Sequence, residues 1–343
     1  MGWLTRAFGG DARAPRDVDA ALRGALLATL SRDWEQAEHL LISACRLDSR
    51  AVEPYLALAR LLRSRGEIGR AIRIHQNLLL RLESDSAEGR RALAGLAADF
   101  HEGGFLRRAI AAYEDVLAGE SKHEPALRAL AQLHAEAREF ERAIEMERRL
   151  AKLEGRAPGP AEAVLRVQMA EAAQAEGRSD VARRALRQAL RRDKRCAPAW
   201  LLLGAVEAER DRPKAALAAW KRVPEFDPQA GASVYPQLEA TFATLGKARD
   251  FEVFLRKRLE GAPGDAVARV ALARHLGARG DLEEALGELR RVLSRDPDDR
   301  EARICLGRLL LAGNRDSEAV KEYAELLDAL DRRGPALDLE EVE

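Results

Sequence analysis

Histidine and cysteine, the side chains that most often bind metals or act as nucleophiles, are few and scattered in this chain. Its three cysteines, Cys45, Cys196 and Cys305, stand far apart. A structural zinc site or a disulfide framework needs cysteines at close, paired spacing. We therefore expect no metal site, no disulfide and no cofactor. The histidines are spread in the same way, at His39, His75, His101, His123, His134 and His275.

Sequence motifs of common enzyme classes are interrupted wherever they begin. Gly246-Lys247 is followed by Ala248 and lacks the earlier glycine of a phosphate-binding loop. His101-Glu102 runs into Gly103 rather than toward a second histidine, as a zinc protease would need. Carboxylates are abundant, but they follow the polar faces of expected helices, and no pair stands out for acid–base work. The sequence therefore predicts a protein that is not an enzyme.

Arginine is the residue whose placement points to recognition. Its planar guanidinium can bind a carboxylate through two parallel hydrogen bonds. A separate run of basic residues follows Asp180, from Arg183 to Arg195. This run fits either a solvated outer helix face or a docking patch for an acidic partner or an anionic membrane surface. The candidates for partner binding are Arg60, Arg63, Arg128, Gln132, Arg274 and Arg308.

Composition limits the kind of protein that could carry these residues. The chain has 343 residues, of which 33% are charged, with 57 basic and 57 acidic side chains. A net charge of zero argues against a nucleic-acid partner, which would require a basic excess. No run without a charged residue is longer than Pro228–Leu238, and Met1–Gly10 has no apolar core of a secretory signal. We therefore expect a cytoplasmic protein whose membrane contact is at most peripheral or through partners.

The elements that position the arginines come from an internal repeat. A small turn residue, several polar residues and then alanine with an apolar neighbour recur, as in Arg65–Ile72 and Arg279–Leu286. We call the alanine of each copy its anchor. The anchors are Ala37, Ala71, Ala109, Ala143, Ala182, Ala216, Phe251, Ala285 and Ala319, mostly spaced by 34 residues. A period of 34 residues with paired helices is the signature of the tetratricopeptide repeat.

The register predicts an all-α, right-handed superhelix of about nine helix pairs, with about eighteen helices and no sheet. Bulky residues such as Trp220 stand four after the anchor, and a large–small pair such as Leu203-Gly204 precedes it. Large residues beside small ones allow close helix packing. We expect a flexible segment over 1–17, the repeat array over 18–335 and an acidic tail over 336–343. A loop at 154–161, rich in glycine and proline, would act as a slight hinge within the array.

The first helix of each pair should line an inner, concave groove that holds a peptide or helix segment of a protein partner. Register places Arg60, Arg63 and Arg128 on one wall of this groove, with Gln132 one turn from Arg128. We expect these arginines to be solvated, so that each replacement by alanine costs less than about 0.5 kcal/mol of stability. A chaperone-tail clamp built on Lys and Asn is not expected, because the only asparagines are Asn77 and Asn314.

Two stretches resemble a known family. Arg63–Gln76 closely resembles the second repeat of the lipopolysaccharide assembly protein B family of Gram-negative bacteria, and Leu245–Phe251 resembles its seventh. The resemblance covers roughly residues 20–330 in order and repeat number. It implies an adaptor at the cytoplasmic face of the inner membrane. Members of the family help a membrane-bound AAA+ protease degrade the deacetylase of lipid A synthesis.

The chain departs from the family at both ends. We expect this protein to lack the family's N-terminal membrane helix and its C-terminal rubredoxin-like domain with two CxxC pairs, so we do not expect metal binding to carry over. We therefore expect a non-catalytic tetratricopeptide adaptor without that anchor and metal domain. The alternative is a tetratricopeptide scaffold of another bacterial envelope, secretion or motility complex. A regulatory domain of an enzyme is disfavoured, because 343 residues of repeats leave no room for a catalytic domain.

Overall fold

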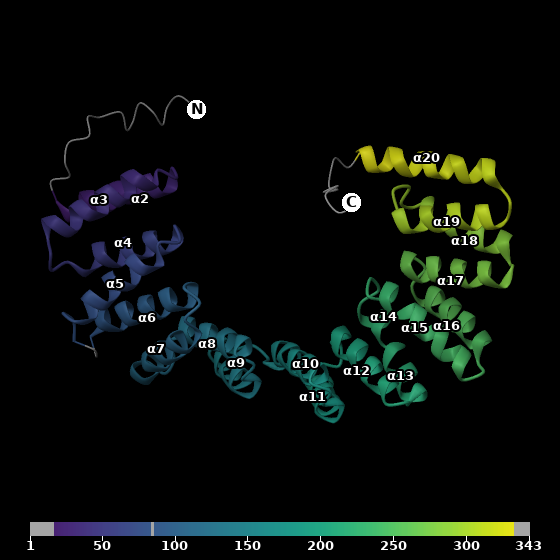
Figure 1. Cartoon of the computed structure of the whole chain (residues 1–343), viewed down its shortest axis with the longest axis horizontal. Helices are drawn as coiled ribbons and strands as arrows, with labels where there is room; N and C mark the ends of the chain where they lie inside the picture. The colour runs from purple at the N-terminus through teal and green to yellow at the C-terminus, as the bar shows by residue number, and fades with distance from the viewer. Residues whose placement is uncertain (1–16, 84–85, 333–343) are drawn as a thin grey trace. The chain divides into compact units, whose positions relative to one another are not determined.

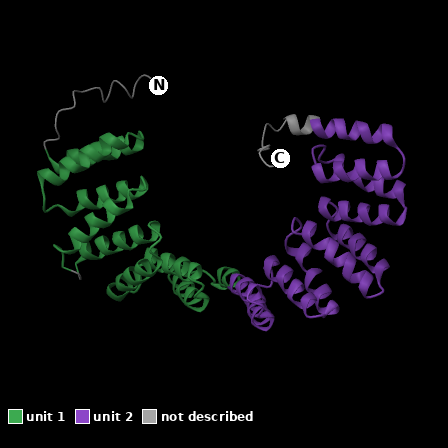
Figure 2. Ribbon diagram, in the orientation of Figure 1, with its two compact units in different colours: residues 1–165 green, residues 166–343 purple. Residues whose placement is uncertain are grey.

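The computed structural model describes residues 17–83 and 86–332, and these ranges contain helices and turns but no strand (Figure 1). The chain divides into two compact units, residues 1–165 and 166–343, which are described separately (Figure 2). The predicted tail over 336–343 and residues 1–16 of the predicted N-terminal segment lie outside the described residues. The all-α tetratricopeptide fold class is confirmed.

The helices alternate as first and second members of nine pairs. Unit 1 contains α2 (Val18–Leu30), α3 (Trp34–Leu47), α4 (Val52–Ser64), α5 (Ile68–Leu79), α6 (Ala87–Glu102), α7 (Leu106–Gly119), α8 (Glu124–Glu136) and α9 (Phe140–Glu154). The boundary between the units falls inside α10 (Gly159–Ala175). Unit 2 continues with α11 (Ser179–Arg192), α12 (Ala197–Glu209), α13 (Pro213–Trp220), α14 (Val223–Phe226), α15 (Gly231–Thr244), α16 (Ala248–Gly261), α17 (Ala266–Arg279), α18 (Leu282–Leu293), α19 (Arg300–Ala312) and α20 (Asp316–Arg332).

The described ranges contain one helix more than the eighteen expected, because the second helix of the sixth pair is broken. α13 ends at Trp220 and the short α14 begins at Val223. Pro224 causes the break, since it has no amide hydrogen and its ring clashes with the carbonyl four residues earlier. The predicted loop at 154–161 is also shorter than expected. Gly155 ends α9 in the left-handed conformation, and α10 begins at Gly159.

The turn inside each pair is the most regular feature of the array. Five residues before every anchor, the backbone has a positive φ. The amide of the next residue then bonds the carbonyl five positions back, as from Glu67 to Leu62 at 2.9 Å. This is the hydrogen bond that ends a helix in a Schellman motif. The nine turn residues are Arg32, Gly66, Gly104, Arg138, Gly177, Asp211, Gly246, Gly280 and Asn314.

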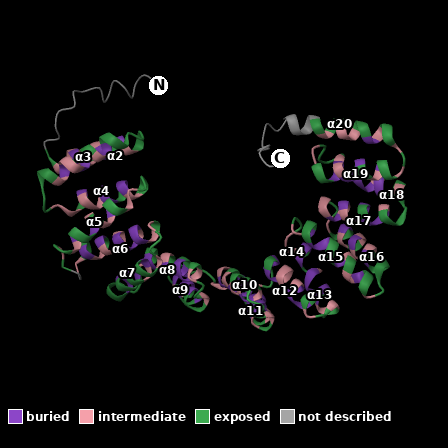
Figure 3. Cartoon of the chain, viewed as in Figure 1, coloured by how far each residue is buried: buried purple, intermediate pink, exposed green. Residues whose placement is uncertain are grey.

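The core of each unit runs between the paired helices, with exposed residues on the outside (Figure 3). Eight anchors are alanines with no exposed surface, and Phe251 is 1% exposed. The predicted large–small pairing is confirmed at Gly204, where an added Cβ would lie 2.2 Å from the Trp220 indole nitrogen. That nitrogen instead donates to the Leu201 carbonyl at 3.1 Å. The repeat register therefore places the first-helix residues as expected.

Candidate interaction site

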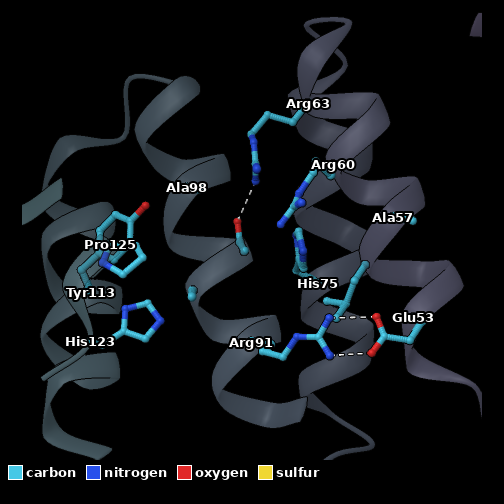
Figure 4. A pocket seen from close by; sticks show the side chains of 13 residues that line it. Glu53, Ala57, Arg60, Arg63, His75, Arg91, Ala98, Tyr113, His123 and Pro125 are labelled. Carbon is cyan, nitrogen blue, oxygen red and sulfur yellow. Dashed lines mark hydrogen bonds and ion pairs between the residues drawn. The ribbon is translucent and has the colours of Figure 1, made fainter. Parts of the chain in front are cut away.

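A pocket of about 400 Å³ opens in unit 1 between the first helices of three successive repeats, α4, α6 and α8 (Figure 4). Its lining residues on α4 are spaced three, four, seven and ten positions apart, which places them on one helix face. They are Glu53, Leu56, Ala57, Arg60 and Arg63. The same spacing recurs on α6 at Arg91, Ala94, Gly95 and Ala98. We call this site the basic pocket.

Arg91 bridges the two helices at one side of the basic pocket. Its guanidinium donates to both carboxylate oxygens of Glu53, at 2.5 and 2.8 Å (Figure 4). These hydrogen bonds lower the pKa of Glu53. More than half of each side chain is exposed, and exposed ion pairs contribute only about 0.2–1 kcal/mol. An incoming carboxylate can therefore compete with Glu53 for Arg91 at little cost.

Arg63 belongs to a buried polar cluster beneath the pocket. Its guanidinium donates to Asp99 Oδ1 at 2.8 Å and to the Gly95 carbonyl at 3.2 Å. The second oxygen of Asp99 lies 2.6 Å from His75 Nδ1. Asp99 has no exposed surface, and His75 is 2% exposed. A buried carboxylate is costly unless it is paired and hydrogen-bonded, and two side chains of the preceding repeat supply those bonds.

This cluster overturns two expectations. Arg63 is not the solvated side chain that its register predicted, because the buried carboxylate of Asp99 in the next repeat requires a cation. Carboxylates also do not all follow polar faces, since Asp99 lies inside the helix packing. Asp99 is more than twenty positions away in sequence from each of its two partners. Only the stacking of repeat two on repeat three brings them together.

Gly95 makes room for this arrangement. A Cβ added to Gly95 would lie 2.2 Å from His75 Nε2, far inside van der Waals contact. Gly95 stands in a helix interior, where glycine is less favourable than alanine by about 0.5–1 kcal/mol. Its place in α6 is explained by the close approach of His75.

Arg60 is the other arginine that α4 contributes to the pocket, and it takes no part in the cluster. It is exposed, lines the basic pocket and extends toward it beside His75 in Figure 4. Over the described ranges no hydrogen bond or ion pair holds its guanidinium. The structure thus brings together Arg60 and Arg63 as the register predicted. Of these two arginines, only Arg60 remains available to a ligand.

The other predicted site residues lie elsewhere. Arg128 binds Glu124 and Glu154, at 2.8 and 2.6 Å, and Gln132 binds Glu136 at 2.8 Å. Neither side chain lines the basic pocket. In unit 2, Arg274 pairs with Glu301 at 2.8 Å and Arg308 is exposed on α19. Their partner-binding roles stay predictions.

Sequence reasoning missed two residues of the basic pocket, Arg91 and His123. Arg91 stands eighteen positions before its anchor, as Glu53 does, so the register alone could have placed it in the groove. His123 precedes α8, and its Nδ1 accepts a hydrogen bond from the Ala126 amide at 3.1 Å. An N-cap role is usual for Ser, Thr, Asp or Asn. No simple sequence signal therefore marked His123.

The basic run from Arg183 to Arg195 is partly used inside unit 2. Arg183 Nε lies 2.5 Å from an oxygen of Glu207, and Arg187 lies 3.7 Å from the same oxygen. Glu207 is 2% exposed, so these arginines compensate a buried carboxylate of the next repeat. This is a structural use that neither sequence interpretation included. Arg184, Arg191 and Arg195 are exposed.

The part of the chain that the structure describes contains neither a membrane-spanning helix nor a cluster of metal ligands. No helix there is long and apolar enough to cross a membrane. No group of three or more His, Cys, Asp or Glu side chains there could hold a metal ion. Burial raises the pKa of the Cys45 thiol to about 11, so this cysteine is a poor nucleophile at neutral pH.

Comparison with solved structures gives only weak global likeness. A tetratricopeptide repeat protein from Parabacteroides merdae has a TM-score of 0.39 at 15% identity, covering 86% of this chain and 98% of that one. The C-terminal part of a repeat protein from Cytophaga hutchinsonii has a TM-score of 0.44 at 12% identity, covering 83% and 99%.

Comparison with known sequences is more informative. Tetratricopeptide repeat models match residues 55–88, 167–231 and 270–335. Lipopolysaccharide assembly protein B of Escherichia coli (strain K12) is 28% identical over 271 residues, 79% of this chain and 69% of that protein. The protein of that name from Haemophilus influenzae is 27% identical over 245 residues, 71% and 61% of the two chains. The chain is therefore a tetratricopeptide-repeat protein similar to lipopolysaccharide assembly protein B.

Proposed function

We propose that this protein is a non-catalytic adaptor that binds an acidic segment of a protein partner in the basic pocket of unit 1. The observation that carries the proposal is Arg60, an arginine at the pocket that pairs with no described residue. The tetratricopeptide array supports a role in protein interaction. The pocket gives that role a definite chemistry.

The charges around the pocket favour a carboxylate. Arg60, Arg63 and Arg91 face one acidic lining residue, Glu53. Arg63 is committed to Asp99, whereas Arg60 is free and Arg91 is held only by an exposed pair. Charge-assisted hydrogen bonds from arginine to carboxylate are about twice as strong as neutral ones. A ligand carboxylate between Arg60 and Arg91 would gain such bonds from both.

The apolar residues of the pocket favour a peptide over a free anion. Leu56, Ala57, Ala94 and Ala98 lie between the charged side chains along α4 and α6. An apolar side chain next to an acidic one would cover these residues while its neighbour binds the arginines. We therefore assign an acidic peptide with interspersed apolar residues as the ligand class.

The cellular role follows from the relatives' name. Because the chain is similar to lipopolysaccharide assembly protein B over 79% of its length, we propose that it acts in the cytoplasm or at the cytoplasmic face of the inner membrane and regulates lipopolysaccharide synthesis. The alternative is a scaffold of another bacterial envelope, secretion or motility complex. Deleting the gene should change lipopolysaccharide content under the first proposal, and secretion or motility with unchanged lipopolysaccharide under the second.

The binding proposal is tested with a fluorescein-labelled acetyl-Glu-Leu-Glu-Leu-Glu peptide and the full chain. Fluorescence anisotropy should show saturable binding that weakens with salt, because the contacts are ionic. Arg60→Ala should weaken binding at least about fivefold, since a contact between a partly desolvated arginine and a carboxylate is worth about 1–3 kcal/mol. Arg60→Lys should have a smaller effect, because lysine keeps the charge but not the planar fork.

The matched control is Arg73→Ala. Arg73 is an exposed arginine on α5, the second helix of the same repeat, and it does not line the pocket. It should leave peptide affinity unchanged. Equal losses in the Arg60 and Arg73 variants would show that general charge attraction, not the pocket, binds the peptide.

A further inference from the structure

Unit 2 has a pocket at the corresponding place in its own repeats. It lies between the first helices of three successive pairs, α15, α17 and α19, and has a volume of about 210 Å³. We call it the acidic pocket because three carboxylates and one guanidinium line it. Its lining residues all belong to unit 2, and none of them lines the basic pocket.

The walls of the acidic pocket are apolar. Val267 and Val270 on α17, Pro236 on α15 and Phe251 on α16 line it. Phe251 stands where the other repeats have an alanine anchor, and its ring is fixed edge-on against His275 at 5.2 Å between centroids. Val270 and Phe251 are 6% and 1% exposed. Val270 and Phe251 thus form a firmly packed floor, which offers a surface for an apolar side chain.

The rim carries three carboxylates, Glu239, Asp299 and Glu301, against one guanidinium, Arg274. One oxygen of each carboxylate has an internal partner. Glu239 Oε1 lies 2.5 Å from His275 Nδ1, and Asp299 Oδ1 accepts from the Ala302 amide at 2.9 Å. Glu301 Oε2 binds Arg274 at 2.8 Å and is largely exposed. Three negative groups around an apolar floor favour a cationic neighbour to the apolar side chain.

We infer that the acidic pocket binds a peptide segment of a protein partner that carries an apolar side chain beside a lysine or arginine. The apolar side chain packs on Val267, Val270 and Phe251. The cation lies at the rim near Asp299, for which the described residues show no ion pair, and near Glu301, which also binds Arg274. This ligand has the opposite charge to the one assigned to the basic pocket.

The test uses the full chain and a fluorescein-labelled acetyl-Lys-Leu-Lys-Leu-Lys peptide, followed by fluorescence anisotropy. The double variant Asp299→Asn, Glu301→Gln removes two of the three rim carboxylate charges, while asparagine preserves the helix cap. It should weaken binding at least about fivefold, as expected for the loss of close charge pairs. Val267→Arg, which places a cation on the apolar wall, should weaken binding at least about tenfold.

Three controls make the test decisive. Glu260→Gln, an exposed carboxylate on α16 outside the pocket, should leave affinity unchanged. Arg60→Ala should also leave it unchanged, so that failure of one pocket is distinguished from failure of the other. Circular dichroism melting verifies that each variant is folded. Absence of saturable binding, equal losses in the Glu260 variant, or full binding by the Val267 variant would each overturn the inference.

Discussion

The basic and acidic pockets occupy the same place in their repeats, yet they differ in charge at matching positions. Eighteen residues before the anchor of the middle repeat, unit 1 has Arg91 and unit 2 has Val267. Before the third first helix, unit 1 has the N-cap His123 and unit 2 has the N-cap Asp299. The repeat therefore sets where a pocket forms, and a few substitutions at fixed positions decide which charge it accepts.

The floors of the two pockets differ as well. Beneath the basic pocket lies the hydrogen-bonded cluster of Arg63, Asp99 and His75. Beneath the acidic pocket lie Phe251 and Val270, which are held by apolar packing. A polar cluster loses stability sharply when one member is removed, because its partners stay buried. An apolar floor loses stability in proportion to the atoms removed.

The largest effect is expected for Arg63→Ala. It leaves Asp99 as a buried carboxylate without its cation, and breaking such a pair costs about 3–5 kcal/mol. Arg60→Ala, three residues earlier on the same helix face, should cost less than about 0.5 kcal/mol. Urea unfolding followed by circular dichroism gives both values. Similar values for the two variants would mean that the cluster does not stabilise unit 1.

Gly95→Ala should lower the stability of the fold by an intermediate amount. In an ordinary helix this change stabilises, but here the new methyl group would displace His75. Overpacking of this kind costs about 1–3 kcal/mol. The matched change in unit 2 is Ala271→Gly, also fourteen residues before its anchor, which should cost only about 0.5–1 kcal/mol. A Gly95 variant with a raised melting temperature would contradict the close contact.

The smallest effect is expected for Glu53→Gln, which removes the exposed pair with Arg91. Because Arg91 lowers the pKa of Glu53, the pair stabilises the fold above the carboxyl's unfolded pKa, and this stabilisation disappears as the pH falls through the folded pKa. The variant should therefore be less stable than the natural chain by at most about 1 kcal/mol at neutral pH. The difference should shrink as the pH falls below the ordinary glutamate pKa of about 4.3, and it should vanish below the folded pKa of Glu53. A difference that grows on acidification would have the wrong sign.

Sequence reasoning gave a reliable register because the repeat is local. Anchors, turn residues and large–small pairs depend on contacts within one helix pair, and Ala71 or Gly204 occupy the environments their positions predicted. The fold class and the face that carries Arg60 followed from that register alone. The broken helix before Pro224 was a local feature too, and it could have been predicted from proline chemistry.

The chemistry of the pockets was less predictable because it arises between repeats. Arg63 was placed on the right face, but its partner Asp99 is 36 residues away. Arg128 was assigned to the same wall, yet Glu124 and Glu154 of its own repeat bind it. A register gives the direction of a side chain, and packing within and between repeats decides whether it is free.

The cluster around Asp99 also affects which repeats of the array dock on one another during folding. Asp99 stands ten residues before its anchor, where the other first helices have no carboxylate. Its two partners, Arg63 and His75, both come from repeat two, and no other repeat offers this combination at these positions. A chain of similar repeats can misassemble by docking the wrong neighbours. Repeat three docked on any other repeat would bury a lone carboxylate, so this one contact distinguishes its proper neighbour from the others.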